Sequence, residues 1–251
     1  MGRFGWQPDT PDIRDFRYQV TKPVPLPASV DLRPKMPAVY DQGDLGSCTA
    51  NAIAAAFEYE QVRAGLADFM PSRLFIYFNE RRMEGTINSD AGAMIRDGIK
   101  SVNKMGVCSE IEWPYRIKDF AKQPPAKVYD DARFHRSIQY FRLTPTLSKL
   151  KQCLASGNPF TFGFTVYESF ESDAVAKSGI VPLPQPDEDV LGGHAVLAVG
   201  YNEQRQRFIA RNSYGAEWGQ RGYFEMPYAY LLEPNLSDDF WVIERVGGLQ
   251  Q

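Results

Sequence analysis

The sequence has few of the residues that would indicate a metal site or a disulfide framework. It contains three cysteines (Cys48, Cys108 and Cys153) and two histidines (His135 and His194). An odd number of cysteines with no close pair argues against a disulfide scaffold, so we expect a reduced chain whose stability comes from its core. These residues also show no clustered ligand pattern, and we therefore expect no metal and no cofactor.

The sequence also lacks a surplus of positive charge and any long apolar run. Its 28 basic and 31 acidic residues give a net charge of −3, which predicts no nucleic-acid partner. No segment approaches the ~20 apolar residues that cross a membrane, and the first residues contain no apolar signal core. We therefore expect a cytoplasmic protein without a membrane partner, with export by another route left open. We also expect a monomer.

Residues 1–26 form an N-terminal extension that differs from the rest of the chain. Its prolines at positions 8, 11, 23 and 25 prevent a long helix. The segment also carries large apolar side chains: Phe4, Trp6, Ile13, Phe16 and Tyr18. Because a free tail rarely exposes so many, we expect them to pack against the folded body. Simple docking is the preferred interpretation, and the alternative is that the extension lies near a cleft and inhibits the protein by limiting access.

The remaining chain divides into a helical half, residues 27–125, and a strand-rich half, residues 126–251. Apolar residues at helical spacing predict helices in the first half at 48–63, 72–85 and 91–106. Pro124-Pro125 indicates the crossing between the halves. In the second half, a short helix at 146–155 is followed by predicted strands at 160–166, 194–199, 207–211, 222–226 and 240–246. We expect an α+β fold with a cleft between the halves.

The stretch from Gln42 to Asn51 is the best candidate for chemistry in the first half. A loop rich in glycine and small polar residues leads directly into an alanine-rich helix. Ser47 is a good N-cap whose hydroxyl can accept an amide of the first turn. Cys48 would then be the first helical residue, where the helix dipole favours the reactive thiolate. The alternative is a buried core cysteine without chemistry.

The second half supplies partners for a cysteine nucleophile. His194 opens a predicted strand directly after Gly192-Gly193, which keep one face of its ring accessible. Asn212 lies at the end of the next strand, in a tight polar turn. A lone histidine is usually structural and an asparagine often only forms a turn, but the two together indicate an imidazole held by a carboxamide.

Three motifs in this order resemble those of the papain-like cysteine peptidases. They are Gln42-Gly-Asp-Leu-Gly-Ser-Cys48 before a helix, Gly193-His194-Ala195-Val196 on a strand, and Asn212-Ser-Tyr-Gly215 followed by Trp218-Gly219 and Gly222-Tyr223-Phe224. The resemblance covers roughly residues 27–246, and it implies a two-domain papain-like fold whose second half is an antiparallel, barrel-like sheet. The aromatic, proline-containing extension is similar to that of bacterial, xylellain-like members.

The resemblance implies a role for each residue of the site. Cys48 would attack a peptide carbonyl and form a thioester, with His194 as general acid and base. Asn212 would orient the ring of His194, and Gln42 would donate its amide to the oxyanion. The substrates would be polypeptides. Substrate would contact Gly92, Gly193 and Ala195, the last two beside a pocket for an apolar side chain.

The sequence departs from the family pattern without losing a catalytic group. Thr49 replaces the tryptophan that usually follows the nucleophile, Leu45 replaces a disulfide cysteine, and Tyr214 replaces the tryptophan beside Asn212. Two alternatives therefore stay open, namely acyl transfer to an amine and an inactive papain-like binding module. A binding module has no need to keep all four residues, which argues against it.

Overall fold

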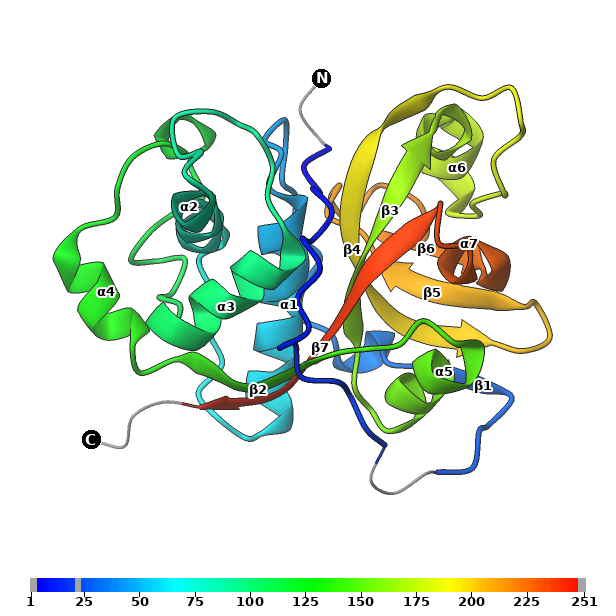
Figure 1. Ribbon diagram of the computed structural model, residues 1–251, viewed down its shortest axis with the longest axis horizontal. Coiled ribbons are helices and arrows are strands. Elements are labelled where there is room, and N and C mark those ends of the chain that lie inside the picture. Colours follow the sequence, from blue (N-terminus) through cyan, green and yellow to red (C-terminus); the bar gives the residue numbers. More distant parts are fainter. Residues whose placement is uncertain (1–3, 21–23, 248–251) are drawn as a thin grey trace.

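The computed structural model describes residues 4–20 and 24–247, and in it a helical half lies beside a half built on a sheet, where further helices also lie (Figure 1). The helices are α1 (Cys48–Arg63), α2 (Arg73–Glu84), α3 (Ile95–Met105), α4 (Ala126–Ala132), α5 (Leu147–Ala155), α6 (Asp173–Ser178) and α7 (Tyr228–Leu232). The strands are β1 (Ser29–Asp31), β2 (Arg136–Arg142), β3 (Phe160–Tyr167), β4 (Val190–Asn202), β5 (Arg207–Arg211), β6 (Tyr223–Pro227) and β7 (Ser237–Gly247). None of the helices in the described ranges is long and apolar enough to cross a membrane.

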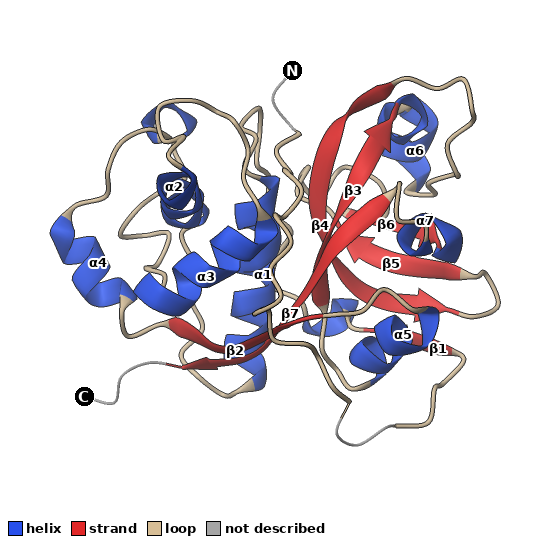
Figure 2. Cartoon of the chain, viewed as in Figure 1, coloured by secondary structure: helices blue, strands red, loops and turns tan. Residues whose placement is uncertain are grey.

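The strands form one sheet in the order β2-β7-β3-β4-β5-β6, with β1 paired to β4. Every pair of strands is antiparallel. On β3 the large side chains of Phe160, Phe162 and Phe164 are fully buried and alternate with small residues, which is typical of a strand with one face in a core. The predicted α+β fold is confirmed (Figure 2).

Helix α1 lies between the other helices and the sheet (Figure 1). Almost its whole length is buried, including the acidic residues Glu58 and Glu60. Its run of alanines explains this position, because small side chains let the helix approach the strands on one side and the helices on the other. Ile53 and Phe57 fill the remaining space and are 0% and 1% exposed. The nucleophile candidate is therefore at the start of the most deeply buried helix.

The sequence did not predict β1, β2, α4, α6 or α7. Two further features differ from the sequence-based prediction. Pro124-Pro125 does not mark the crossing between the halves, because Pro125 is the N-cap of α4 and the chain reaches the sheet only at β2. Proline is well tolerated at a helix start, where its missing N–H has no partner to lose. Strand β4 begins at Val190 and not at His194, since the glycines at 192 and 193 still pair with β3.

The N-terminal segment runs between the two halves, and we call its described residues 4–20 the strap (Figure 1). Trp6 and Tyr18 are buried, as expected. The expectation was wrong for Ile13 and Phe16, which are 102% and 69% exposed because they lie at an outward turn of the strap. The predicted extension also included residues 1–3 and 21–23, which lie outside the described residues.

Candidate active site

Cys48 is the first residue of α1, as the sequence predicts. Ser47 is the N-cap by position, but the prediction that its hydroxyl accepts an amide of the first turn was wrong. The hydroxyl instead lies 2.5 Å from the hydroxyl of Tyr115 and accepts a hydrogen bond of 3.1 Å from Nδ2 of Asn51. The side chain is fully buried, so a neighbouring phenol competes successfully with the helix amides.

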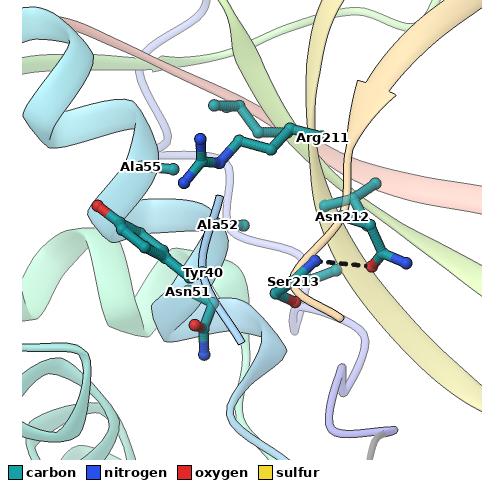
Figure 3. A pocket seen from close by; sticks show the side chains of 10 residues that line it. Tyr40, Asn51, Ala52, Ala55, Arg211, Asn212 and Ser213 are labelled. Atoms are coloured by element: carbon teal, nitrogen blue, oxygen red, sulfur yellow. Dashed lines mark hydrogen bonds between the residues drawn. The ribbon is translucent and has the colours of Figure 1, made fainter. Parts of the chain in front are cut away.

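His194 and Asn212 come from neighbouring strands, and their side chains meet. His194 lies within β4, and Asn212 follows the last residue of β5, the strand paired with β4. Nε2 of His194 is 2.8 Å from Oδ1 of Asn212. The same oxygen accepts the backbone N–H of Ser213 at 2.8 Å (Figure 3). Because a carboxamide oxygen only accepts, Nε2 of His194 must carry a proton, and the proton-accepting nitrogen of the neutral ring is Nδ1.

Aromatic rings enclose the imidazole. The ring centroid of Tyr214 lies 5.1 Å from that of His194, and the ring of Phe164 meets it edge-on at 5.6 Å. His194 is 0% exposed and Asn212 2%. The cavity beside Asn212, between α1 and the strands, has a volume of only ≈ 10 Å³ (Figure 3), about the minimum for one water molecule. The hydrogen bond between the two side chains is therefore shielded from bulk solvent.

Gln42 joins the loop before the nucleophile to the turn after Asn212. The hydroxyl of Ser213 donates to Oε1 of Gln42 at 2.6 Å, and the backbone N–H of Gln42 donates to the carbonyl of Ser213 at 2.9 Å. Nε2 of Gln42 donates to the carbonyl of Leu45 at 2.8 Å, within the loop that leads to Cys48. These bonds fix which end of the carboxamide is the donor, and they aim it toward the nucleophile loop.

The thiol of Cys48 is completely buried. Burial raises its pKa to about 12, and the carboxyl of Glu80 acts in the same direction, whereas backbone N–H groups of Ala195 and Gly5 act on the sulfur to lower it. Ala195 directly follows His194, so the sulfur borders the strand that carries the imidazole. Gly5 belongs to the strap, so the strap reaches the nucleophile itself.

The strap contacts two of the three residues predicted to bind substrate. The backbone N–H of Trp6 donates to the carbonyl of Gly193 at 3.0 Å. On the other side, the carbonyl of Gly5 accepts the N–H of Ala93 at 2.7 Å. A Cβ atom on Gly92 would lie 2.1 Å from that carbonyl, so only glycine permits the approach. The strap therefore spans the groove between Gly92 and Gly193.

The side chain of Trp6 occupies a pocket on the sheet side of this groove. Its indole lies so close to Gly163 that a Cβ there would be 2.0 Å from the ring. The indole N–H donates to Oδ2 of Asp239 at 3.0 Å, and Trp6 is 8% exposed. The pocket expected to prefer apolar side chains thus has a carboxylate at its inner end.

Sequence reasoning missed three residues of this arrangement. Ser213 could have been found, because it follows Asn212 in the motif and its hydroxyl is next to the turn. Tyr115 and Asp239 gave no signal of their own, since their contacts join residues far apart in the chain. Thr49, which stands where the family usually has a tryptophan, is fully buried and donates to Oε1 of Glu80 at 2.6 Å.

Comparisons with known proteins identify the family of the chain. The family described as papain family cysteine protease matches residues 26–231. The crystal structure of xylellain, a cysteine protease from Xylella fastidiosa, aligns with a TM-score of 0.90 and 45% identity over 97% of this chain and 96% of that chain. An uncharacterized peptidase C1-like protein of Acanthamoeba polyphaga mimivirus is 44% identical over 97% of this chain and 87% of its own. Pro-cathepsin H from Bos taurus is 30% identical over 80% of this chain, which spans 59% of that protein. The resemblance inferred from the motifs is confirmed.

Proposed function

Because the chain belongs to the papain family of cysteine proteases, we propose that it hydrolyses peptide bonds through a thioester on Cys48. The sulfur attacks the carbonyl carbon of the scissile bond while its proton passes to Nδ1 of His194. The imidazolium then protonates the leaving amine, and a water molecule activated by the same ring hydrolyses the thioester. The observation that supports this most directly is the hydrogen bond of 2.8 Å between His194 and Asn212. Ala195, the residue after His194, has a backbone N–H that acts on the Cys48 sulfur.

Gln42 would stabilise the oxyanion together with the backbone N–H of Cys48. Its carboxamide is held by Ser213 at the oxygen end, so the nitrogen end faces the nucleophile loop. A donor already oriented in this way needs no reorganisation when charge develops on the carbonyl oxygen. Removing one such donor commonly costs about 2.7–4 kcal/mol of transition-state stabilisation.

Labelling by an epoxide thiol inhibitor tests this function. We expect the Trp6→Ala variant, in which the strap is weakly held, to gain the mass of one inhibitor molecule, and the Trp6→Ala/Cys48→Ala double variant to gain none. Cys153→Ala in the same Trp6→Ala background is the matched control, because that thiol is equally buried but lies in α5, where it contacts the carbonyl of Asn158, and it should label like Trp6→Ala. If Trp6→Ala gains no mass and the double variant binds the same partners as Trp6→Ala, the chain is an inactive binding module.

Acyl transfer to an amine is a second outcome of the same chemistry. Digestion of a peptide library in the presence of a small amine distinguishes the two by mass spectrometry. Hydrolysis yields new carboxyl ends, whereas transfer yields amides carrying the added amine. The same digest would give the side chains preferred around the cleavage site.

We further propose that the strap inhibits the peptidase. It contacts Gly92 and Gly193, whose backbones a substrate would need, and it completes the burial of the Cys48 sulfur. A thiol with a pKa near 12 is almost wholly protonated at neutral pH, and the protonated form is a poor nucleophile. Departure of the strap would rehydrate the sulfur and allow a thiolate–imidazolium pair to form.

Two alanine variants of the strap test the inhibition. Trp6→Ala removes the side chain that anchors the strap in its pocket, and we expect kcat/KM to rise at least ~10-fold, since burying an indole contributes several kcal/mol. Phe16→Ala is the matched control, because that ring lies on the same segment but is exposed. Equal kcat/KM for wild type and Trp6→Ala would leave the strap as a simple docking segment.

A further inference from the structure

We propose that the strap is held by a latch that responds to pH, in which Asp9 of the strap and Asp239 of β7 form a buried acidic pair. The latch is closed in mild acid and opens as the pair loses its proton toward neutral pH. This proposal rests on the proposed inhibition by the strap, and it makes that inhibition depend on pH.

The strap and β7 are joined by reciprocal hydrogen bonds, in which each segment supplies an indole donor and a carboxylate acceptor. Nε1 of Trp6 and the backbone N–H of Asp9 both donate to Oδ2 of Asp239, at 3.0 and 2.7 Å. In return, Nε1 of Trp241 in β7 donates to Oδ2 of Asp9 at 2.8 Å. The two carboxylate side chains are 0% and 1% exposed. Each carboxylate thus depends on the other segment for hydrogen bonds, and each would be rehydrated if the strap left.

The charges around the pair do not balance. Arg142 of β2 lies 2.9 Å from Oδ1 of Asp239 and 3.9 Å from Oδ2 of Asp9. The same guanidinium also faces Asp15 at 3.6 Å and Asp238 at 3.2 Å. The second cation, Arg96 of α3, faces Asp15 at 3.7 Å and its neighbour Asp97 at 3.9 Å. Among the described residues, two guanidiniums therefore face three buried carboxyls, Asp9, Asp15 and Asp239. Asp97 and Asp238 are more exposed, at 18% and 56% of their side chains.

An excess of buried carboxylates is tolerated only when some of them hold a proton. Burial raises the pKa of Asp9 to about 7, and the nearby charge of Asp239 adds to this. The backbone N–H of Arg96, the indole of Trp241 and the charge of Arg142 act in the opposite direction. The pKa of Asp239 is raised as well, again first by burial. In mild acid Asp9 holds a proton, so the two buried carboxyls do not both carry a negative charge.

The direction of the pH effect follows from these shifts. A released strap exposes both carboxyls, whose pKa values then return toward ~4. The closed state therefore binds more protons than the released state between about pH 4 and pH 7. The extra stability of the closed state is complete below that window. As the pH rises through it, the ratio of closed to released strap falls by up to ~10-fold per pH unit for each shifted group. The strap should accordingly leave the cleft more readily at neutral pH than in acid.

Hydrogen exchange of the full chain carrying Cys48→Ala tests the latch without self-digestion. The probes are the backbone amides of Trp6, Gln7 and Asp9, which donate to Gly193, Ala93 and Asp239. Rates are corrected for the intrinsic pH dependence of exchange, and amides in the middle of α1 serve as the internal reference. We expect protection of the strap amides to fall at least ~10-fold from pH 4.5 to pH 7.5, with α1 unchanged.

Two strap variants then locate the titrating group. Asp9→Asn keeps an acceptor for Trp241 without a titrating charge, and its strap should stay protected at pH 7.5. Asp12→Asn is the matched control, because Asp12 is on the same segment but pairs with the exposed Arg14 at 2.8 Å, which lowers the pKa of its carboxyl below this range. It should behave like wild type.

The latch is overturned if wild-type strap protection stays constant over this range, or if Asp9→Asn loses protection as steeply as wild type. Because the tested protein has no nucleophile, this result is independent of the peptidase activity. If Trp6→Ala leaves kcat/KM unchanged while the exchange data follow the expected pattern, only the proposed inhibition fails. If the exchange data fail while Trp6→Ala activates, the strap inhibits without a pH latch.

Discussion

His194 and Asn212 are joined by a hydrogen bond of 2.8 Å between Nε2 of the ring and the carboxamide oxygen. The oxygen is itself fixed by the N–H of Ser213, so the donor and acceptor roles follow from the backbone. Both side chains lie in a nearly dry environment, where a hydrogen bond is stronger than in water. The tautomer and the orientation of the ring are therefore set before any substrate arrives.

Replacing Asn212 with alanine should lower activity without unfolding the protein. The ring of His194 would lose the carboxamide oxygen that accepts from Nε2, and the ring would be free to turn. We expect kcat/KM to fall by about 10–100-fold, equivalent to ~1.4–2.7 kcal/mol. The measurement is steady-state hydrolysis of a peptide substrate, in a Trp6→Ala background so that the strap does not limit the rate. Asn235→Ala, at an exposed turn, should keep full activity. An active Asn212→Ala enzyme would show that the aromatic rings alone orient the imidazole.

Ser213 is predicted to act on the oxyanion site through Gln42. In Ser213→Ala the oxygen of the carboxamide loses its donor at 2.6 Å, and the side chain can rotate. We expect kcat to fall by about 10-fold with little change in KM, because the oxyanion forms only in the transition state. A rise in KM at constant kcat would instead assign Ser213 to substrate binding. Ser178→Ala removes an exposed hydroxyl of α6 and is the control.

Much of the helical half could be predicted because its signals are local. The start of α1 at Cys48 follows from the small polar loop before an alanine run, and its end near Arg63 follows from Gly65, which adopts a left-handed φ of 67°. Asn212 was assigned to the end of a strand by the same kind of reasoning. These features depend on a few consecutive residues, and the sequence contains all of them.

The contacts that close the site could not be predicted, because they join distant residues. In the sequence, Asp239 is one of two acidic residues before a predicted strand. Its contacts with Trp6 and Asp9 form only in the folded chain. Strand β2 was missed for a similar reason, since its residues are mostly half-exposed and its pairing with β7 is remote in sequence. The position of the strap depends on such contacts, so the sequence alone could not decide between simple docking and inhibition.

Gly5 offers a way to displace the strap from within. A Cβ atom on Gly5 would lie 1.8 Å from the carbonyl oxygen of Gly46, so Gly5→Ala cannot keep the present path of the strap. We expect Cys48 to react at least several-fold faster with iodoacetamide, because its sulfur becomes hydrated and its pKa falls from about 12. The reaction is followed by intact mass at pH 7. Ile13→Ala changes a fully exposed strap residue and should leave the rate unchanged. Equal rates for Gly5→Ala and wild type would mean that the strap does not shield the sulfur.

The last prediction concerns the stability of the fold, and it depends on carboxyls buried along α1. Burial raises the pKa of Glu60 to about 8, although its salt bridge to Arg63 at 2.8 Å lowers it, and burial likewise raises the pKa of Glu58 to about 7. In the unfolded chain both return to ~4.3. The folded state therefore binds more protons from about pH 4 to pH 8, and stability should be greatest at the acidic end of this window and fall as the pH rises through it.

We expect thermal unfolding of the Cys48→Ala protein to show this fall directly. Its Tm should be lower at pH 8 than at pH 5, with Glu60 alone accounting for on the order of 2 kcal/mol, or roughly 4–8 °C. Glu60→Gln should remove that part of the difference, because a neutral carboxamide has no proton to lose. Asp130→Asn, at a carboxylate with 68% side-chain exposure, should keep the wild-type pH dependence. A Tm that rises from pH 5 to pH 8 would mean that the ion pair with Arg63 outweighs the burial of Glu60.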